Sequence, residues 1–254
     1  MYDDFNSSEV TRSMVRFDAS GVESGQTTSE PADGLTDRTA RFADPRAAGR
    51  ALASRLEAYG GADVIVVAVA HGGVPVAAEV SRRLDAPLDL VLIRRLLVPR
   101  GTESQVCAFD VCGTLVVDEE LPPRPAVPSN GLDHFVADAL GELARAARAC
   151  RGARPALDDL KGKTVLLVDN GIRTGLTMRS AIRALRTLGP SRIVAAVPVA
   201  APESRAFVET VADELICLAW PEPFGHVGVW YKDFARPGEE EIREMLEESE
   251  RART

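Results

Sequence analysis

The sequence predicts an α/β fold with a doubly wound, mostly parallel sheet and a small hood region. Continuous apolar runs such as Val64–Val69 and Leu88–Ile93 have the length and composition of buried strands. Stretches with apolar residues at helical spacing separate these runs, and the alternation continues toward the C-terminus. Strands that are apolar on both sides need helices over both faces, so we expect two helical layers around one sheet.

The folded domain is expected to span residues 41–254. Residues 1–40 have few apolar residues and no sustained periodicity, which predicts a disordered N-terminal tail. The first helix should begin at Asp44, a good N-cap, with Pro45 at its first position. The next expected elements are a strand over 64–69, a helix through Leu84 and a strand over 88–93.

The second half of the chain repeats the alternation of strands and helices. A long amphipathic helix from Leu132 to Ala147 has one apolar stripe, which belongs to the core or to a dimer seam. A last helix is expected after Pro237, because Glu239–Glu241 suit the positive end of a helix dipole. The elements between them are strands over 163–169, 192–199 and 214–218 and helices over 175–188 and 203–211.

Residues 96–130 break this rhythm. The segment contains Pro99, Gly101 and a proline cluster at 122–125, and a hairpin is expected around Cys112. We interpret it as a mobile hood.

The composition is that of a globular protein and excludes several functional classes. With 254 residues, of which 45% are hydrophobic, the chain can bury one large core. A net charge of −8 argues against a nucleic-acid binder, which needs a concentrated basic face. No apolar run is long enough to span a membrane, so no membrane partner is expected. The first residues do not have the pattern of a signal peptide, so a cytoplasmic location is expected. The four cysteines have no paired spacings, so neither disulfides nor a zinc site is predicted.

The turn at 169–177 carries the strongest functional signal. It follows the apolar run Val165–Val168 and leads into a predicted helix, so its backbone amides and the helix dipole can attract an anion. Thr174 and Thr177 add hydroxyl groups beside these amides. A phosphate alone would not need the carboxylate of Asp169, which suggests a ligand that also carries hydroxyls or a metal. A sugar phosphate satisfies both demands.

Two other turns should lie close to this one. In open α/β sheets ligands bind outside the carboxyl ends of the strands, at one crevice. The strand over 64–69 ends there in Ala70-His71-Gly72-Gly73, and the strand over 88–93 is followed by Arg94 and Arg95. We therefore expect glycine-rich backbone and two cations beside the sugar-phosphate turn.

The turn at 169–177 resembles the signature loop of type I phosphoribosyltransferases. In that loop four apolar residues precede an acidic pair, a short turn and Thr-Gly-x-Thr. From about Arg41 onward the chain also resembles the stand-alone bacterial branch of that family, through residues 70–75, 94–96 and 227–234.

The resemblance implies a reaction and a set of site residues. The protein would transfer phosphoribose from phosphoribosyl pyrophosphate to a nitrogenous base, with Mg²⁺ bridging pyrophosphate and ribose oxygens, and would form a homodimer. Asp169 would bind the ribose hydroxyls and the metal. The implied catalytic residues are Asp169, Asn170, Arg94 and Arg95. The implied substrate-binding residues are Gly171, Ile172, Arg173, Thr174, Gly175 and Thr177 for the 5-phosphate and Ala70, His71, Gly72 and Gly73 for the pyrophosphate.

Three residues depart from the family pattern. Asn170 replaces the second acid, His71 stands where arginine is usual, and Arg173 replaces a small or acidic residue. Beside a diphosphate the His71 imidazole would tend to be protonated. The alternatives are an active enzyme, a degenerate sensor of nucleotide or phosphoribosyl pyrophosphate with a regulatory role, and a structural partner without a ligand.

Three aromatic residues near the C-terminus have two interpretations. Trp230, Tyr231 and Phe234 either stack on an acceptor ring near the crevice or pack in the core.

Overall fold

The computed structural model describes residues 14–17, 41–61, 63–97, 105–111, 114–118, 129–156 and 159–253. For residues 14–17, 94–97, 105–111, 114–118 and 129–136 it describes the backbone alone.

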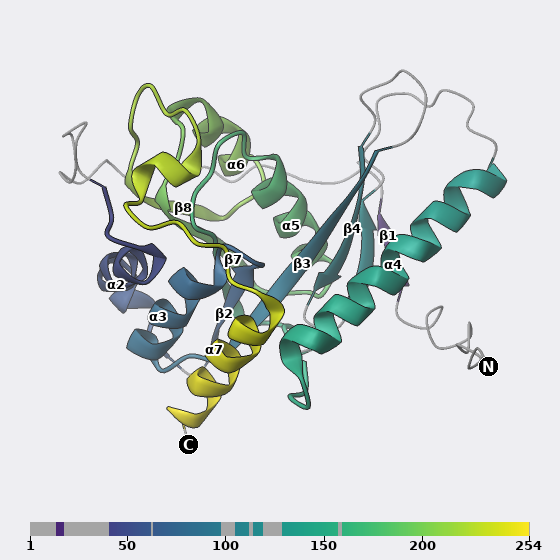
Figure 1. Cartoon of the computed structure of the whole chain (residues 1–254), viewed down its shortest axis with the longest axis horizontal. Coiled ribbons are helices and arrows are strands. Elements are labelled where there is room, and N and C mark those ends of the chain that lie inside the picture. The colour runs from purple at the N-terminus through teal and green to yellow at the C-terminus, as the bar shows by residue number, and fades with distance from the viewer. Residues whose placement is uncertain are drawn as a thin grey trace.

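The described strands form one sheet in the order β1-β5-β4-β3-β2-β6-β7-β8 (Figure 1). Five neighbouring strands run parallel and form its centre, as the sequence predicted. These five strands are β3 (Leu88–Leu97), β2 (Val64–Val69), β6 (Thr164–Val168), β7 (Arg192–Val199) and β8 (Glu214–Ala219).

Three further strands extend the sheet beyond β3. Strands β4 (Gln105–Val111) and β5 (Thr114–Asp118) are antiparallel, and Val111 pairs with Thr114, so the chain turns back between them. The pairing agrees with the hairpin expected around Cys112, a residue that lies outside the described part of the chain. The hood as a separate unit therefore stays a prediction.

Two expected boundaries differ from the structure. Strand β3 continues to Leu97 because its last residues pair with β4, whereas the sequence placed the end of the strand at Ile93. Met14–Phe17 forms strand β1, which runs parallel to β5, although these residues were predicted to belong to a disordered tail. A short apolar segment can join a sheet through main-chain pairing alone, and periodicity over a long window does not detect it.

Helices cover both faces of the sheet, which confirms the doubly wound prediction. Side chains of β2 alternate between the two faces, with Val66 in one core cluster and Val67 in the other. The first face is covered by α2 (Pro45–Arg55), α3 (Val74–Leu84), α4 (Ser129–Arg151) and α7 (Glu239–Arg251). The second face is covered by α5 (Leu176–Arg186) and α6 (Arg205–Glu209). The described residues also form the short 3-10 helices η2 (Glu57–Tyr59), η3 (Pro202–Ser204) and η4 (Val227–Trp230).

Helix α2 begins as the sequence predicted. The Asp44 carboxylate accepts a hydrogen bond from the Ala47 amide at 2.7 Å, and Pro45 occupies the first helical position. This N-cap fixes the direction in which the chain enters the fold, beside the C-terminal segment described below.

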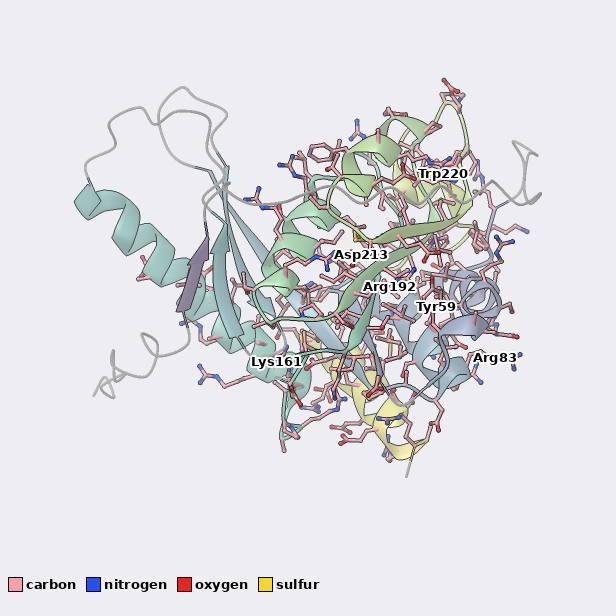
Figure 2. All side chains as sticks on the ribbon, turned by 180° about the vertical axis from the view of Figure 1, so that it is seen from behind. Tyr59, Arg83, Lys161, Arg192, Asp213 and Trp220 are labelled. Carbon is pink, nitrogen blue, oxygen red and sulfur yellow. The ribbon has the colours of Figure 1, made fainter. Side chains whose placement is uncertain are left out.

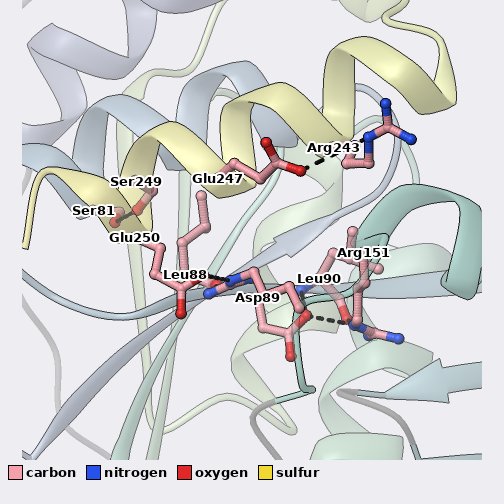
Figure 3. Close-up of polar contacts among 10 residues, drawn as sticks. Ser81, Leu88, Asp89, Leu90, Arg151, Arg243, Glu247, Ser249 and Glu250 are labelled. Carbon is pink, nitrogen blue, oxygen red and sulfur yellow. Dashed lines mark hydrogen bonds and ion pairs between the residues drawn. The ribbon is translucent and has the colours of Figure 1, made fainter.

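A buried ion pair fastens the end of α4 to β3 (Figure 3). Arg151 Nε lies 2.9 Å from Asp89 Oδ1, and both side chains are buried. Arg151 Nη2 also donates to the Leu90 carbonyl at 3.1 Å, so the guanidinium is held by strand and carboxylate together. Such pairs contribute little net stability, but removing one partner leaves an uncompensated buried charge.

A second polar cluster lies at the start of β8, on the side of the molecule seen in Figure 2. Arg192 Nη2 and the Tyr59 hydroxyl both donate to Glu214 Oε2. Burial and the bond to Glu214 raise the pKa of Tyr59 to about 12. In the described part of the chain, no helix has the length and apolar character needed to span a membrane.

Candidate active site

We call the space outside the carboxyl ends of the neighbouring strands β2 and β6 the crevice. The chain leaves β2 toward β3 on one side and leaves β6 toward β7 on the other, while β2 and β6 are neighbours. Ala68 pairs with Val168, so the turns that follow the two strands start side by side. This is the kind of switch point at which open α/β sheets bind ligands.

The two turns touch, and glycines allow the contact. A Cβ added to Gly72 would lie 2.2 Å from Asn170 Nδ2. A Cβ added to Gly73 would lie 2.6 Å from the Val69 carbonyl oxygen and 2.7 Å from that of Val168. Any larger residue at position 73 would therefore push the two strand ends apart. The structure thus brings the predicted turns at 70–73 and 169–177 together.

Asp169 directly follows the last residue of β6, at the carboxyl end of that strand. Its Oδ1 accepts a hydrogen bond from the Asn170 amide at 2.7 Å. Burial raises the pKa of Asp169 to about 7, and the bond from Asn170 opposes this shift. Near neutral pH the carboxyl is therefore partly protonated, and a cation or a hydroxyl-bearing ligand would favour its charged form.

The loop after Asp169 is fixed at both ends. Ile172 forms a parallel bridge with Ala200, with the Ile172 amide donating to Val199 and the Ala201 amide donating to Ile172. Gly175 has a φ of +80° and packs against α6, a conformation and a space that favour glycine. Arg173 and Thr174 lie between these two fixed points and are exposed.

The start of α5 can accept an anion. Gly175 is the N-cap residue and provides no side-chain hydrogen bond to the first turn. The amides of a first helical turn have no acceptor within the helix, and the helix dipole is positive there. The predicted residues Thr174 and Thr177 flank this turn. The arrangement agrees with the phosphate site expected from the sequence.

A C-terminal segment, which belongs to neither of the two turns, contacts both of them. We call residues 226–238 the strap. The strap runs alongside the first residues of the folded domain. The Phe42 amide donates to the Trp230 carbonyl, and the Lys232 amide donates to the Phe42 carbonyl. The hydroxyl of Tyr231 donates to the main-chain carbonyl of Asn170 at 2.5 Å. Burial and the neighbouring Asp169 raise the pKa of Tyr231, so the phenol stays protonated and remains a donor.

The strap also reaches the other turn, at His71. Arg236 Nη2 lies 3.0 Å from His71 Nδ1. An arginine can only donate, so Nδ1 must be the acceptor, and a neutral imidazole carries its proton on Nε2. Burial and the nearby Arg236 lower the pKa of His71, while Glu239 opposes the shift. The protonated imidazole that the sequence predicted beside a bound diphosphate stays a prediction. In this structure the neighbour of the ring is a guanidinium, which favours the neutral form.

The aromatic residues of the strap divide between the two interpretations. Trp230 and Tyr231 are buried in a core cluster, and Trp230 Nε1 donates to the Phe224 carbonyl at 3.0 Å. Phe234 stacks on Tyr231 with ring centroids 5.0 Å apart and is 41% exposed. Core packing therefore holds for the first two residues, and Phe234 is the one of the three that is largely exposed.

The two predicted arginines after Ile93 are placed by their backbone. Arg94 pairs with Ala108 and Arg95 with Cys107, within the antiparallel β3–β4 ladder. Their side chains lie outside the described part of the structure. Their role toward a diphosphate stays a prediction.

The described residues suit a metal that is held largely by its substrate. Among them, no three His, Cys, Asp or Glu side chains gather in a cluster that could hold a metal ion. Mg²⁺ in nucleotide sites is usually held by one or two carboxylates together with phosphate oxygens and water. Asp169 can supply one such carboxylate, so the residues present fit Mg²⁺ bound with a phosphorylated ligand.

Comparison with known proteins identifies the family. The model of the phosphoribosyl transferase domain matches residues 43–233. The chain belongs to the type I phosphoribosyltransferase family. A curated relative in Mycobacterium tuberculosis strains H37Rv and CDC 1551, whose name assigns it provisionally to the phosphoribosyl transferases, is 35% identical over 210 residues. The match covers 83% of this chain and 47% of the relative, so the chain spans about half the length of the curated relatives it matches.

A solved structure agrees with the family fold. The crystal structure of TT1426 from Thermus thermophilus has 36% sequence identity and a TM-score of 0.69. The match covers 82% of this chain and 98% of the Thermus chain. The two proteins therefore share most of the fold.

Sequence reasoning missed one residue that reaches the crevice. Arg236 comes from the strap, 165 positions from His71, and a lone arginine in a loop gives no local signal of such a contact. The Pro237-Gly238 pair marked only the start of the last helix.

Proposed function

We propose that the protein binds phosphoribosyl pyrophosphate and transfers its phosphoribosyl group to a nitrogenous base, with release of pyrophosphate. The observation that carries this proposal is the contact between the turn at 70–73 and the turn at 169–177, beside the uncapped start of α5. An anion site, a carboxyl and a second glycine turn lie together there. A ligand with two phosphate ends and a ribose between them matches this order of groups.

Each part of the ligand has a proposed partner. The amides from Arg173 to Thr177 bind the 5-phosphate at the start of α5. Asp169 accepts hydrogen bonds from the ribose hydroxyls. The backbone of residues 70–73 holds the pyrophosphate, and Arg94 or Arg95 neutralises it as it departs.

The reaction breaks the bond between the anomeric carbon and a pyrophosphate oxygen, and a nitrogen of the base forms the new bond. Positive charge develops on the sugar while negative charge develops on the leaving group, so the site must stabilise both. The Asp169 carboxylate, in its charged form, faces the sugar. Mg²⁺, when bound through Asp169, would neutralise charge on the pyrophosphate and ribose oxygens.

The neutral side chain of Asn170 weakens this site without removing it. An amide replaces a charge-assisted hydrogen bond with a neutral one, at a cost of about 1–2 kcal/mol. The Asn170 side chain also packs on Gly72, so it joins the two turns. We therefore propose a working site with reduced negative charge.

The neutral side chain of Asn170 also favours a second candidate, a sensor that binds phosphoribosyl pyrophosphate or a nucleotide without turnover. Asn170 is neutral, and the raised pKa of Asp169 reduces its charge near pH 7. A site with little negative charge can hold a sugar phosphate while stabilising a cationic sugar poorly. A regulatory role would follow from binding alone.

Thermal unfolding of the full chain with Mg²⁺, with and without phosphoribosyl pyrophosphate, tests binding. A ligand at 100 times its Kd adds about 2.7 kcal/mol, which raises the Tm by several degrees. Pyrophosphate release is then measured against a panel of purine and pyrimidine bases. Stabilisation with base-dependent release supports the enzyme, and stabilisation without release supports the sensor. No stabilisation by any ribose phosphate or nucleotide would refute both.

Two other properties remain part of the proposal. The homodimer that the family suggests is tested by sedimentation velocity of the full chain. The cytoplasmic location predicted from composition is tested by fractionation of cells that express it.

A further inference from the structure

The strap contacts both turns of the crevice from a distant part of the chain. Tyr231 reaches the carbonyl of Asn170, and Arg236 reaches the imidazole of His71. The second contact lies at the turn that the proposed function assigns to the pyrophosphate. A cation therefore stands at the place where the leaving group would carry its charge.

Arg236 has no carboxylate to neutralise it among the described residues. Within the described part of the chain, no ion pair within 4.0 Å involves its guanidinium. Its side chain is exposed, although other arginines such as Arg82 and Arg243 pair with acids. Its polar contact is with a neutral ring nitrogen, which an anion would replace readily. A guanidinium offers a planar fork of donors that matches phosphate oxygens.

The backbone on the C-terminal side of Arg236 holds the side chain near the crevice. Pro237 is buried, and the Gly238 amide donates to Glu241 Oε2 at 2.8 Å at the start of α7. Lys232 and Asp233, on the other side, donate main-chain hydrogen bonds to Phe42 and Ala43. Both ends of the segment that carries Arg236 are thus fixed.

We propose that Arg236 binds the diphosphate end of the ligand, and that neutral His71 keeps the guanidinium in place until the ligand arrives. This inference rests on the proposed function and adds to it a residue on the strap that recognises the leaving group. Arg236 would act together with the backbone of residues 70–73. A ligand that lacks a diphosphate would gain nothing from it.

The test compares two probes on the full chain by isothermal titration calorimetry with Mg²⁺. Pyrophosphate reports on the diphosphate end, and ribose 5-phosphate reports on the start of α5. Arg236→Gln should weaken pyrophosphate about ten- to one-hundredfold, the usual loss for a hydrogen bond to a charged group, and should leave ribose 5-phosphate unchanged. Arg236→Lys should restore part of the pyrophosphate affinity, because it keeps the charge but not the fork.

Arg83→Gln is the matched control. It removes the same charge from an exposed side chain that pairs with Glu57, in the last turn of α3 and away from the crevice (Figure 2). This variant should bind both probes as the unaltered protein does. Equal losses in the two variants would mean that net charge alone acts, and this would overturn the role of Arg236.

The outcomes separate the two proposals. If ribose 5-phosphate binds and Arg236→Gln binds pyrophosphate normally, the role of Arg236 is wrong and the proposed function stands. If the unaltered protein binds neither phosphoribosyl pyrophosphate nor either probe, both proposals are wrong. Circular dichroism of each variant shows that the fold is intact before any loss is attributed to binding.

Discussion

The hydroxyl of Tyr231 donates a hydrogen bond to the main-chain carbonyl of Asn170 across 2.5 Å. The bond joins the strap to the turn that begins with Asp169, and Tyr231 is itself held by the main-chain bridge to Phe42. The position of the turn at the mouth of the crevice therefore depends on two segments that lie far from it in the sequence.

Replacing Tyr231 with phenylalanine should loosen this turn. The variant loses a bond to a buried carbonyl, so its free energy of unfolding should fall by about 1 kcal/mol. The rise in Tm caused by phosphoribosyl pyrophosphate should also be smaller. Tyr59→Phe is the control, because its hydroxyl bonds Glu214 at the other end of the sheet (Figure 2). It should reduce stability and leave the ligand effect unchanged, and equal ligand effects in the two variants would contradict the prediction.

Replacing Asp169 with asparagine should change how stability depends on pH. The pKa of this carboxyl is raised from 3.8 to about 7, so the folded state binds the proton more tightly than the unfolded chain. The resulting stabilisation is complete below about pH 4 and is lost as the pH rises toward 7 and above, with a slope of at most about 1.4 kcal/mol per pH unit. In thermal unfolding from pH 5 to pH 8, the Tm of the variant should rise relative to the Tm of the unaltered protein. A constant difference in Tm across this range would show that Asp169 titrates normally.

Replacing Gly73 with alanine should separate the two strand ends. The added methyl group would meet backbone oxygens of β2 and β6, which cannot move independently of the sheet. We expect a loss of about 1–3 kcal/mol in the free energy of unfolding, measured in urea. Gly61→Ala is the control, since a Cβ there meets nothing within 4 Å. If both variants unfold at the same urea concentration, the contact between the turns is looser than described.

Replacing Arg151 with methionine should destabilise the fold without affecting the ligand site. Asp89 would keep a buried charge with its ion-pair partner removed, which costs about 3–5 kcal/mol in comparable proteins. The double variant Asp89→Leu with Arg151→Met should recover part of this loss, because no buried charge remains. Urea unfolding measures both variants, and an additive loss in the double variant would contradict the argument.

Restoring an acid at position 170 distinguishes the two candidate functions. Asn170→Asp combined with Arg173→Ala should create turnover if the protein is a sensor, since the changes return the family pattern. If the protein is already an enzyme, they should change pyrophosphate release only modestly. The measurement is pyrophosphate release with each base, using Thr210→Ala, an exposed position at the end of α6, as a neutral control.

Short-range patterns in the sequence predicted much of the fold. The strand β6 and the helix α5 lie within two residues of their predicted bounds, because apolar periodicity and a glycine-rich turn act locally. The end of β3 was misplaced because its last residues are stabilised by pairing with β4, a partner that periodicity does not reveal. The strand β1 was missed for the same reason.

The candidate site was predicted only as far as its residues lie in consecutive motifs. Asn170 and Gly72 come together because parallel strands end at the same edge of the sheet. The contacts of Tyr231 and Arg236 depend on how the strap returns across that edge, and this path is set by main-chain bonds to Phe42. The neutral state of His71 could not be predicted either, since it depends on the neighbour that the strap supplies.

The bridge between Ile172 and Ala200 has a consequence for how this protein can diversify. Main-chain hydrogen bonds at Ile172 and the packing of Gly175 fix the loop. The side chains of Arg173 and Thr174 therefore contribute little to its conformation. Under the proposed function, variation at these two positions should alter which molecule is accepted while the scaffold survives. A library randomised at residues 173 and 174 is therefore the natural starting point for changing ligand preference in this lineage.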